Sequence, residues 1–382
     1  MSFNFAETAV ALSACETYDI DALKNIFHKH FQELGIYKQI RQGIKALIKP
    51  NLIMKSKPDE AIITHPNVVA AAGLCLKEAG AEILIAESPG GPYTTGMMKS
   101  VFAGCGYTEM AKKYGFALYM ECESKDIFLP EGKRCKTLEI VNPFLEADFI
   151  VNIAKLKTHG MMGMSGAVKN LFGAVPGLKK PELHCRFPQQ QEFAEMIVDI
   201  CDFLKPKLNI IDAVYGMQGD GPTGGESRFV GAVITSQSPY AADMAAAEII
   251  GKKPEDFFIM KECIERGLVP KLVKDLQILG DAVEKFVVAD YKQAKVSSLD
   301  FVDRAPKIFR PMLKRLTTPY PKIRLKECIG CGKCAESCPQ KVIKMAERKA
   351  IIKYASCIKC FCCHEMCPEH VIDIKRWGVF NF

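Results

Sequence analysis

The sequence predicts an α/β protein: a layered, mostly parallel sheet domain followed by a small α+β domain rich in cysteine. Apolar, strand-like runs alternate with helical patterns over residues 1–300, and this order builds a parallel sheet covered by helices. Nine of the 17 cysteines then fall between Cys328 and Cys367. We therefore expect an α/β domain over 1–300, a basic linker over 301–320 and the small domain over 321–382.

The expected strands and helices follow in chain order. The run 46–53 is apolar apart from a central Lys-Pro-Asn triplet. A helix is predicted after it, because Pro66 suits a first helical position and Gly80 a helix stop. Further strands are predicted at 82–87, 147–154, 208–214 and 228–236, and further helices at 190–205 and 240–251.

Polar, glycine-rich segments follow three of these strands, at 87–91, 155–173 and 215–225. In a parallel sheet, ligands bind at the carboxyl ends of the strands, so these segments are expected to form a pocket. No Walker motif is present. The glycine stretches GDGPTGG (219–225) and GCGYTE (104–109) lack the order of strand, glycine loop and helix that a dinucleotide-binding fingerprint requires. The sequence therefore gives no support for nicotinamide or ATP binding.

The segment 155–173 is the most informative of the three. It carries up to four positive charges, and its glycines let the backbone approach a ligand closely. Such a segment suits an anion: a carboxylate, a phosphate or an electron-rich cofactor. The alternative is a flexible, solvated loop whose lysines point outward. Nearby basic side chains extend the positive character, namely Lys179, Lys180, His184 and Arg186.

Six side chains are the expected binding and catalytic residues of this pocket. A histidine with an unperturbed pKa of about 6.5 suits acid–base work near neutrality, so His159 is the expected proton donor. Asp212 is an acid partner at the end of a strand. The expected catalytic residues are thus His159, Lys157 and Asp212, and the expected substrate- or cofactor-binding residues are Lys155, Lys169 and Asn170.

The cysteines of the small domain form an internal repeat. Two runs of the form C-x2-C-x2-C-x3-C-P follow each other at a constant offset of 29 residues. Two-residue gaps aim three thiolates at one iron–sulfur cubane, and the fourth cysteine of each run binds the other cluster. The spacing therefore predicts two [4Fe–4S] clusters, one held by Cys328, Cys331, Cys334 and Cys367 and the other by Cys357, Cys360, Cys363 and Cys338.

Cys362 falls outside the repeat, so we expect it to be a free thiol beside a cluster. Two zinc sites are an alternative that fits the spacing poorly, since a structural zinc held by four cysteines usually needs two CxxC pairs with a longer spacer. The small domain resembles a bacterial two-cluster ferredoxin, with a helical turn and a short hairpin expected between the runs. Because cysteine caps every iron, any substrate chemistry is expected elsewhere in the chain.

Charge and composition restrict the remaining functions. Eight Lys or Arg and no acid lie between Arg304 and Lys326, within a net charge of +7. This run suits a solvated linker or a docking face for an acidic redox partner protein, and we expect neither nucleic acid nor a membrane as partner. A basic signal-peptide region and a long apolar run are both missing, so a cytoplasmic location is expected. The many free thiols suit a reducing, anaerobic cell.

Four stretches taken together resemble the domain-of-unknown-function 362 family. They are KPN (49–51), ESPGG (87–91), AKLKTHGMMGMSGAVKNLFG (154–173) and DAVYGMQGDGPTGG (212–225). The family is described as iron–sulfur proteins of anaerobic bacteria and archaea, and its members often carry a C-terminal two-cluster ferredoxin module. Glu87 stands where the family often has Asp, which keeps the charge. The resemblance implies an architecture and cofactors, and it assigns no catalytic residues.

Two functions follow as hypotheses. In the first, the protein is an iron–sulfur oxidoreductase whose ferredoxin module passes low-potential electrons to an anionic substrate in the α/β domain. In the second, it is a non-catalytic electron carrier or adaptor, and the α/β domain only docks a partner oxidoreductase. A bound small molecule or flavin would favour the first hypothesis. Electron delivery to a partner that salt abolishes would favour the second.

Overall fold

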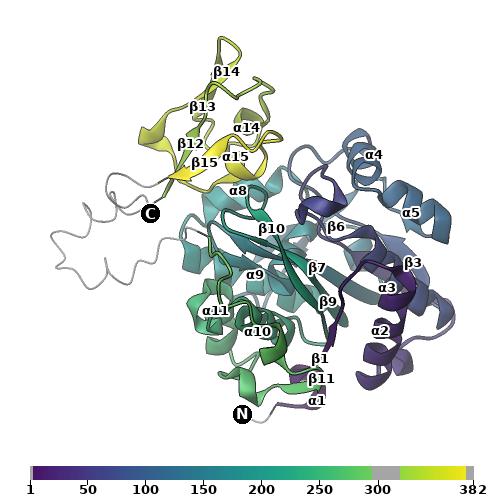
Figure 1. The fold of residues 1–382 in the computed structure, drawn as a ribbon. Coiled ribbons are helices and arrows are strands. Elements are labelled where there is room, and N and C mark those ends of the chain that lie inside the picture. The colour runs from purple at the N-terminus through teal and green to yellow at the C-terminus, as the bar shows by residue number, and fades with distance from the viewer. Residues whose placement is uncertain (1–2, 295–318, 376–382) are drawn as a thin grey trace.

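The computed structural model describes residues 3–294 and 319–375 and confirms the predicted fold class. A mixed α/β domain with a large, mostly parallel sheet is followed by a small domain with its own strands (Figure 1). Most of the expected linker, 301–318, lies outside the described residues. Among the described helices, none has the length and apolar character needed to cross a membrane.

The large sheet combines a parallel half with an antiparallel edge. The strands β7, β2, β3 and β4 pair in parallel, as do β7 and β9, whereas β10 pairs antiparallel with both β9 and β1. β8 pairs with the end of β7 alone. The order across the sheet is β11 (Gln277–Gly280), β1 (Ala9–Ala14), β10 (Glu226–Ser236), β9 (Leu208–Gln218), β7 (Phe149–His159), β2 (Lys45–Lys49), β3 (Glu82–Ile85) and β4 (Ala117–Leu118), with β8 at Gly163–Ser165.

Helices cover both faces of this sheet, because successive side chains of a strand point to opposite faces. In β1, Val10 and Leu12 belong to one hydrophobic core and Ala9 and Ala11 to the other. The first core packs against α7 (Ala167–Asn170), α9 (Gln190–Leu204), α10 (Pro239–Ile249) and α11 (Phe258–Glu265). The second packs against α2 (Ile20–Glu33), α3 (Pro66–Glu78), α4 (Thr95–Gly104) and α5 (Tyr107–Tyr114). Smaller elements are α1 (Phe5–Thr8), β5 (Ser124–Phe128), β6 (Thr137–Val141), α6 (Pro143–Glu146) and α8 (Lys179–Arg186).

Two strands extend beyond their predicted ends. β7 continues five residues past 154, and β9 continues past 214, so parts of the two expected loops are strand. Every residue of β7 is buried, including Lys155 and Lys157. Polar residues at a strand end predict a loop only when water solvates them. Here, polar groups inside the protein replace water as the partners of Lys155 and Lys157. The alternative of a solvated loop with lysines that point outward is therefore wrong for these two residues.

The small domain contains two short two-stranded sheets and two one-turn helices. β12 (Tyr320–Ile323) pairs with β15 (Ile372–Lys375), and β13 (Ile343–Ala346) forms a hairpin with β14 (Lys349–Ile352). α14 (Lys333–Glu336) and α15 (Cys362–Glu365) each begin inside a cysteine run. The domain contacts α8 and the segment after β9, while its β13–β14 hairpin projects away from the large domain (Figure 1).

Candidate functional site

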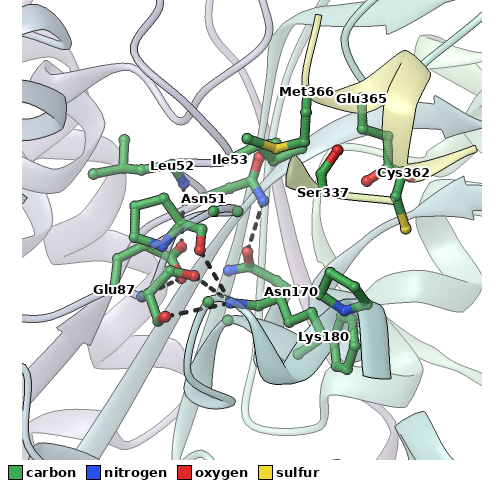
Figure 2. Close-up of a pocket in the computed structure, with 18 of the residues that line it drawn as sticks. Asn51, Leu52, Ile53, Glu87, Asn170, Lys180, Ser337, Cys362, Glu365 and Met366 are labelled. Atoms are coloured by element: carbon green, nitrogen blue, oxygen red, sulfur yellow. Dashed lines mark hydrogen bonds between the residues drawn. The ribbon is translucent and has the colours of Figure 1, made fainter. Parts of the chain in front are cut away.

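A cavity of about 90 Å³ lies between the two domains, at the carboxyl ends of β2 and β3. The large domain contributes the segments that follow these strands, together with α7 and α8. Figure 2 shows the small domain closing the opposite wall. The lining residues used below are Lys49, Asn51, Glu87, Ser88, Lys169, Asn170, Phe172, Lys180 and His184 from the large domain and Ser337, Cys362, Glu365 and Met366 from the small domain.

A buried ion pair forms the floor of this cavity. Lys49 Nζ lies 2.5 Å from Glu87 Oε2 and donates to Asn170 Oδ1 at 3.0 Å. Burial lowers the pKa of Lys49, and the Glu87 carboxylate opposes that shift. Asn170 also accepts from Asn51 Nδ2 at 3.0 Å and donates to Asn152 Oδ1 at 2.8 Å. The predicted binding residue Asn170 therefore lines the cavity, but its amide holds the floor together.

Gly173 is required for this close packing. A Cβ at this position would lie 2.0 Å from Glu87 Oε1 and 2.5 Å from Lys49 Cε. We expect Gly173→Ala to lower the free energy of unfolding by about 1–3 kcal/mol through overpacking, measured by urea unfolding without oxygen. The control is Gly96→Ala in α4, where a Cβ meets nothing within 4 Å and helix propensity favours alanine. Equal stability of the two variants would contradict the expectation.

Lys169 presents an unpaired ammonium to the cavity. Within the described part of the chain its Nζ has neither a hydrogen bond nor an ion pair. Burial lowers its pKa, whereas the negative groups of Glu365 and Cys362 across the cavity favour the charged form. Lys169 as a whole is only partly buried. A partly desolvated cation without a partner is unfavourable, and a bound anion would relieve that cost.

Lys180 and His184 add polar groups from one face of α8, four residues apart. Lys180 Nζ donates to the Ser88 carbonyl oxygen at 2.5 Å and contacts neutral oxygens only. Burial lowers its pKa to about 7. The His184 ring stacks on Phe193 at 4.3 Å, and its buried Nδ1 has no hydrogen-bond partner among the described residues. Burial lowers the pKa of His184 to about 3, so the ring is neutral near pH 7.

The other predicted lysines lie behind the cavity rather than in it. Lys155 Nζ pairs with Asp212 Oδ2 at 3.0 Å and donates to the Tyr18 hydroxyl at 2.8 Å. Lys157 Nζ donates to Asn51 Oδ1 at 2.6 Å and to a backbone carbonyl at 2.7 Å. The structure thus brings Lys155 and Asp212 together, and it connects Lys157 to the cavity only through Asn51.

His159 lies at the contact between the domains. Its Nδ1 accepts from the backbone N–H groups of Met161 and Met162, at 3.1 and 3.2 Å. The proton of the neutral ring is therefore on Nε2, which lies 3.2 Å from Glu365 Oε1 in the small domain. Burial and the nearby Lys169 lower the pKa of His159 to about 4. The unperturbed pKa on which the proton-donor prediction depends is not found in this environment.

The cysteines of the two runs surround two separate small cavities in the small domain. Each cavity receives three thiols from one run and the fourth from the other, which is the crossed arrangement that the spacing predicts. Among the described residues no three His, Cys, Asp or Glu side chains converge on a single-ion site. The first cavity is lined by Cys328, Cys331, Cys334 and Cys367, and the second by Cys338, Cys357, Cys360 and Cys363.

The second of these cavities faces the pocket between the domains. Gln340, which lines it, donates to the Cys185 thiol of α8 at 3.3 Å. Cys362 lies beside Cys360 and lines the interdomain pocket. The expected free thiol is therefore part of the pocket wall. Sequence analysis missed the contribution of Glu365 and Met366, because one sequence does not show which domain surfaces meet.

The chain is 26% identical over 317 residues to the thylakoid-associated protein sll1697 of Synechocystis sp. (strain ATCC 27184 / PCC 6803 / Kazusa), covering 82% of this chain and 96% of that protein. The lactate racemase apoprotein of Thermoanaerobacterium thermosaccharolyticum is 13% identical, with a TM-score of 0.38. That match covers 63% of this chain and only 57% of the racemase chain.

Sequence models of two families match separate parts of the chain. The 4Fe–4S dicluster domain matches residues 320–368, so the small domain is a ferredoxin-type domain that binds [4Fe–4S] clusters for electron transfer. The second model matches residues 46–248, more than half of the chain. This chain therefore belongs to the family described as domain of unknown function (DUF362).

Proposed function

We propose that this protein is an iron–sulfur reductase that binds a small organic anion in the pocket between its two domains. The observation that carries the proposal is the unpaired ammonium of Lys169, enclosed in a pocket one wall of which is the ferredoxin-type domain. A partly desolvated cation without a counter-charge in contact is unfavourable, and a bound anion would complete the site. The proposal combines this binding site with the electron-transfer domain beside it.

The eight cysteines of the repeat fit two clusters. Each of the two cavities has four thiols around it, and mostly apolar residues close the rest of its wall, with Glu369 at the first cavity and Gln340 at the second. A bound [4Fe–4S] cluster would supply one-electron transfer at a low potential. We assign Cys328, Cys331, Cys334 and Cys367 to one cluster and Cys338, Cys357, Cys360 and Cys363 to the other.

The second cysteine set lies next to the pocket in which we propose that the anion binds. Ser337 and Cys362 line the pocket, and each directly precedes a cysteine of that set in the sequence. On the other side of the pocket, α8 carries both Lys180 and the cysteine that contacts Gln340. An anion held by Lys169 would therefore lie between α8 and the second cysteine set, and electrons would cross a short stretch of protein.

Three side chains have suitable chemistry for the anion and for the proton that accompanies its reduction. Lys169 offers charge, and His184 offers a ring nitrogen without a partner. Lys180, with its pKa lowered to about 7, can hold and release a proton near neutrality. His159 remains a candidate through its contact with Glu365, although its neutral ring at pH 7 makes Lys180 the better proton donor.

The pH dependence of anion binding tests the role of Lys180. The charged groups facing it are Glu87, Lys49 and Lys169. Since only the protonated amine attracts an anion, affinity should be highest below pH 7 and should fall as the pH rises through the pKa of about 7. Isothermal titration with small carboxylates between pH 6 and 8 measures this. Arginine keeps its charge across this pH range, so Lys180→Arg should make anion affinity nearly independent of pH. If affinity still falls with pH as steeply as in the unaltered protein, another group is responsible for the pH dependence.

One experiment tests the proposed function as a whole. Protein purified without oxygen is analysed by mass spectrometry for a retained small molecule, and by titration with mono- and dicarboxylates and inorganic phosphate. Iron and sulfide are counted on the same sample, and about eight of each are expected. Binding of an anion together with a change in the cluster spectrum supports the reductase. Full cluster content with no anion binding would favour the electron-carrier alternative.

A further inference from the structure

The two cysteine sets of the small domain differ in their surroundings. The second set faces α8 and the interdomain pocket, as described above. Two cysteines of each set are buried, but the first set also contains Cys331, which is the one exposed thiol among the eight. Residues of the small domain line both cavities, but the second set has two neighbours in the chain that also line the interdomain pocket, Ser337 and Cys362, whereas the first set has one, Met366. If electrons pass from one cluster to the other, the first cysteine set is therefore the end at the protein surface, and the second set is the end at the pocket.

Exposed apolar side chains surround the first set. Ile329 is 57% exposed and Met345 is 40% exposed, and both line the same cavity as Cys331. Met345 is in the hairpin that projects away from the large domain (Figure 1). Such residues at the centre of a surface, rimmed by charged groups, are typical of a protein interaction site.

The rim of this surface is mainly basic. Lys326 and Lys333 are exposed on either side of the Cys328–Cys331 loop. The backbone of Arg348 packs against this loop at Gly330, where a Cβ would come within 2.1 Å of the Arg348 carbonyl oxygen. Glu327 is paired with Arg324 at 2.9 Å, which leaves Glu347 and Glu369 as nearby acids. Over 320–375 the domain carries eleven Lys or Arg and six Asp or Glu.

We propose that an acidic one-electron carrier protein docks on this donor face, defined by Lys326, Ile329, Cys331, Lys333, Met345 and Arg348, and that electrons leave through the second cysteine set toward the pocket. The carrier loses one electron, and the cluster held at the first set gains it, with no proton transferred between the proteins. Basic rim charges would steer an acidic carrier and raise the association rate. This inference depends on the two-cluster part of the proposed function and on nothing in the anion site.

The first measurement uses the unaltered, cluster-loaded protein and oxidised flavodoxin as an acidic probe. Carbodiimide joins carboxylates to amines that are in contact, and mass spectrometry then locates the cross-links. We expect them at Lys326 and Lys333. Lys353 follows Ile352, which lines the second cavity. Cross-links confined to Lys353 would place the partner beside the second cysteine set and would overturn the proposal.

The second measurement follows cluster bleaching when reduced flavodoxin is mixed with the protein. The double variant Lys326→Glu/Arg348→Glu should lower the second-order rate about tenfold or more at low salt. Lys353→Glu is the matched control, because Lys353 is exposed and follows Ile352 of the second cavity, and it should change the rate far less. Photoreduced deazaflavin, a small reductant, should bleach all variants equally, which shows that their clusters are intact. Equal rates for all variants with flavodoxin would refute the donor face, whether or not the pocket binds an anion.

Discussion

Cys363→Ala is expected to bind about four irons per chain instead of about eight, whereas its neighbour Cys362→Ala should keep about eight. Both side chains are buried and adjacent in α15, so the two substitutions remove the same atoms from nearly the same place. Only Cys363 lines one of the two four-thiol cavities, while Cys362 lines the interdomain pocket. Loss of one ligand should remove the cluster beside the pocket and leave the other.

Iron and sulfide analysis measures this directly, and the spectrum of the reduced protein gives a second reading. Interaction between two neighbouring reduced clusters should be present in Cys362→Ala and absent in Cys363→Ala. Anion binding in the pocket should survive in Cys363→Ala, because Lys169 and Lys180 belong to the large domain. About eight irons in Cys363→Ala, or about four in Cys362→Ala, would contradict the ligand assignment.

The cysteine repeat shows what one sequence can determine. Ligand spacing is local, and the constant offset of 29 residues separates Cys363 from Cys362 without any structure. The alternation of strand and helix patterns likewise predicts the layered sheet, because side-chain periodicity reports which faces are buried. The ends of β7 and β9 were predicted too early, since residues such as Lys157 suit a loop unless internal partners replace water.

The pocket was only partly predictable for a related reason. The rule that ligands bind at the carboxyl ends of strands selects the correct edge of the sheet, and Lys169 and Asn170 do line the pocket. Whether a lysine there is free or paired depends on its neighbours in space, and Asp212 neutralises Lys155 across two strands. The spacing of Lys180 and His184 along α8 was a usable signal. The sequence carries no comparable signal for Glu365, because the position of this side chain in the pocket depends on how the two domains dock.

Lys169→Met is expected to weaken binding of small carboxylates by about ten- to hundredfold, or about 1.5–3 kcal/mol, the range for hydrogen bonds to charged groups. Methionine keeps most of the side chain's length and removes the one unpaired ammonium found among the described residues of the pocket. Because Lys169 makes no hydrogen bond or ion pair within the described protein, its replacement should not lower the free energy of unfolding. Isothermal titration and urea unfolding, both without oxygen, measure the two effects.

Lys179→Met is the matched control, since it removes the same charge from the chain just outside the pocket. Lys179 is about half exposed and pairs loosely with Glu139 and Glu182, at 3.5 Å each. Surface pairs of this kind contribute little, so both anion affinity and stability should stay close to those of the unaltered protein. If the two variants bind carboxylates equally well, the anion site is not at Lys169. Weaker binding in Lys169→Met alone, with eight irons retained, would show that the pocket's charge selects its ligand independently of the clusters.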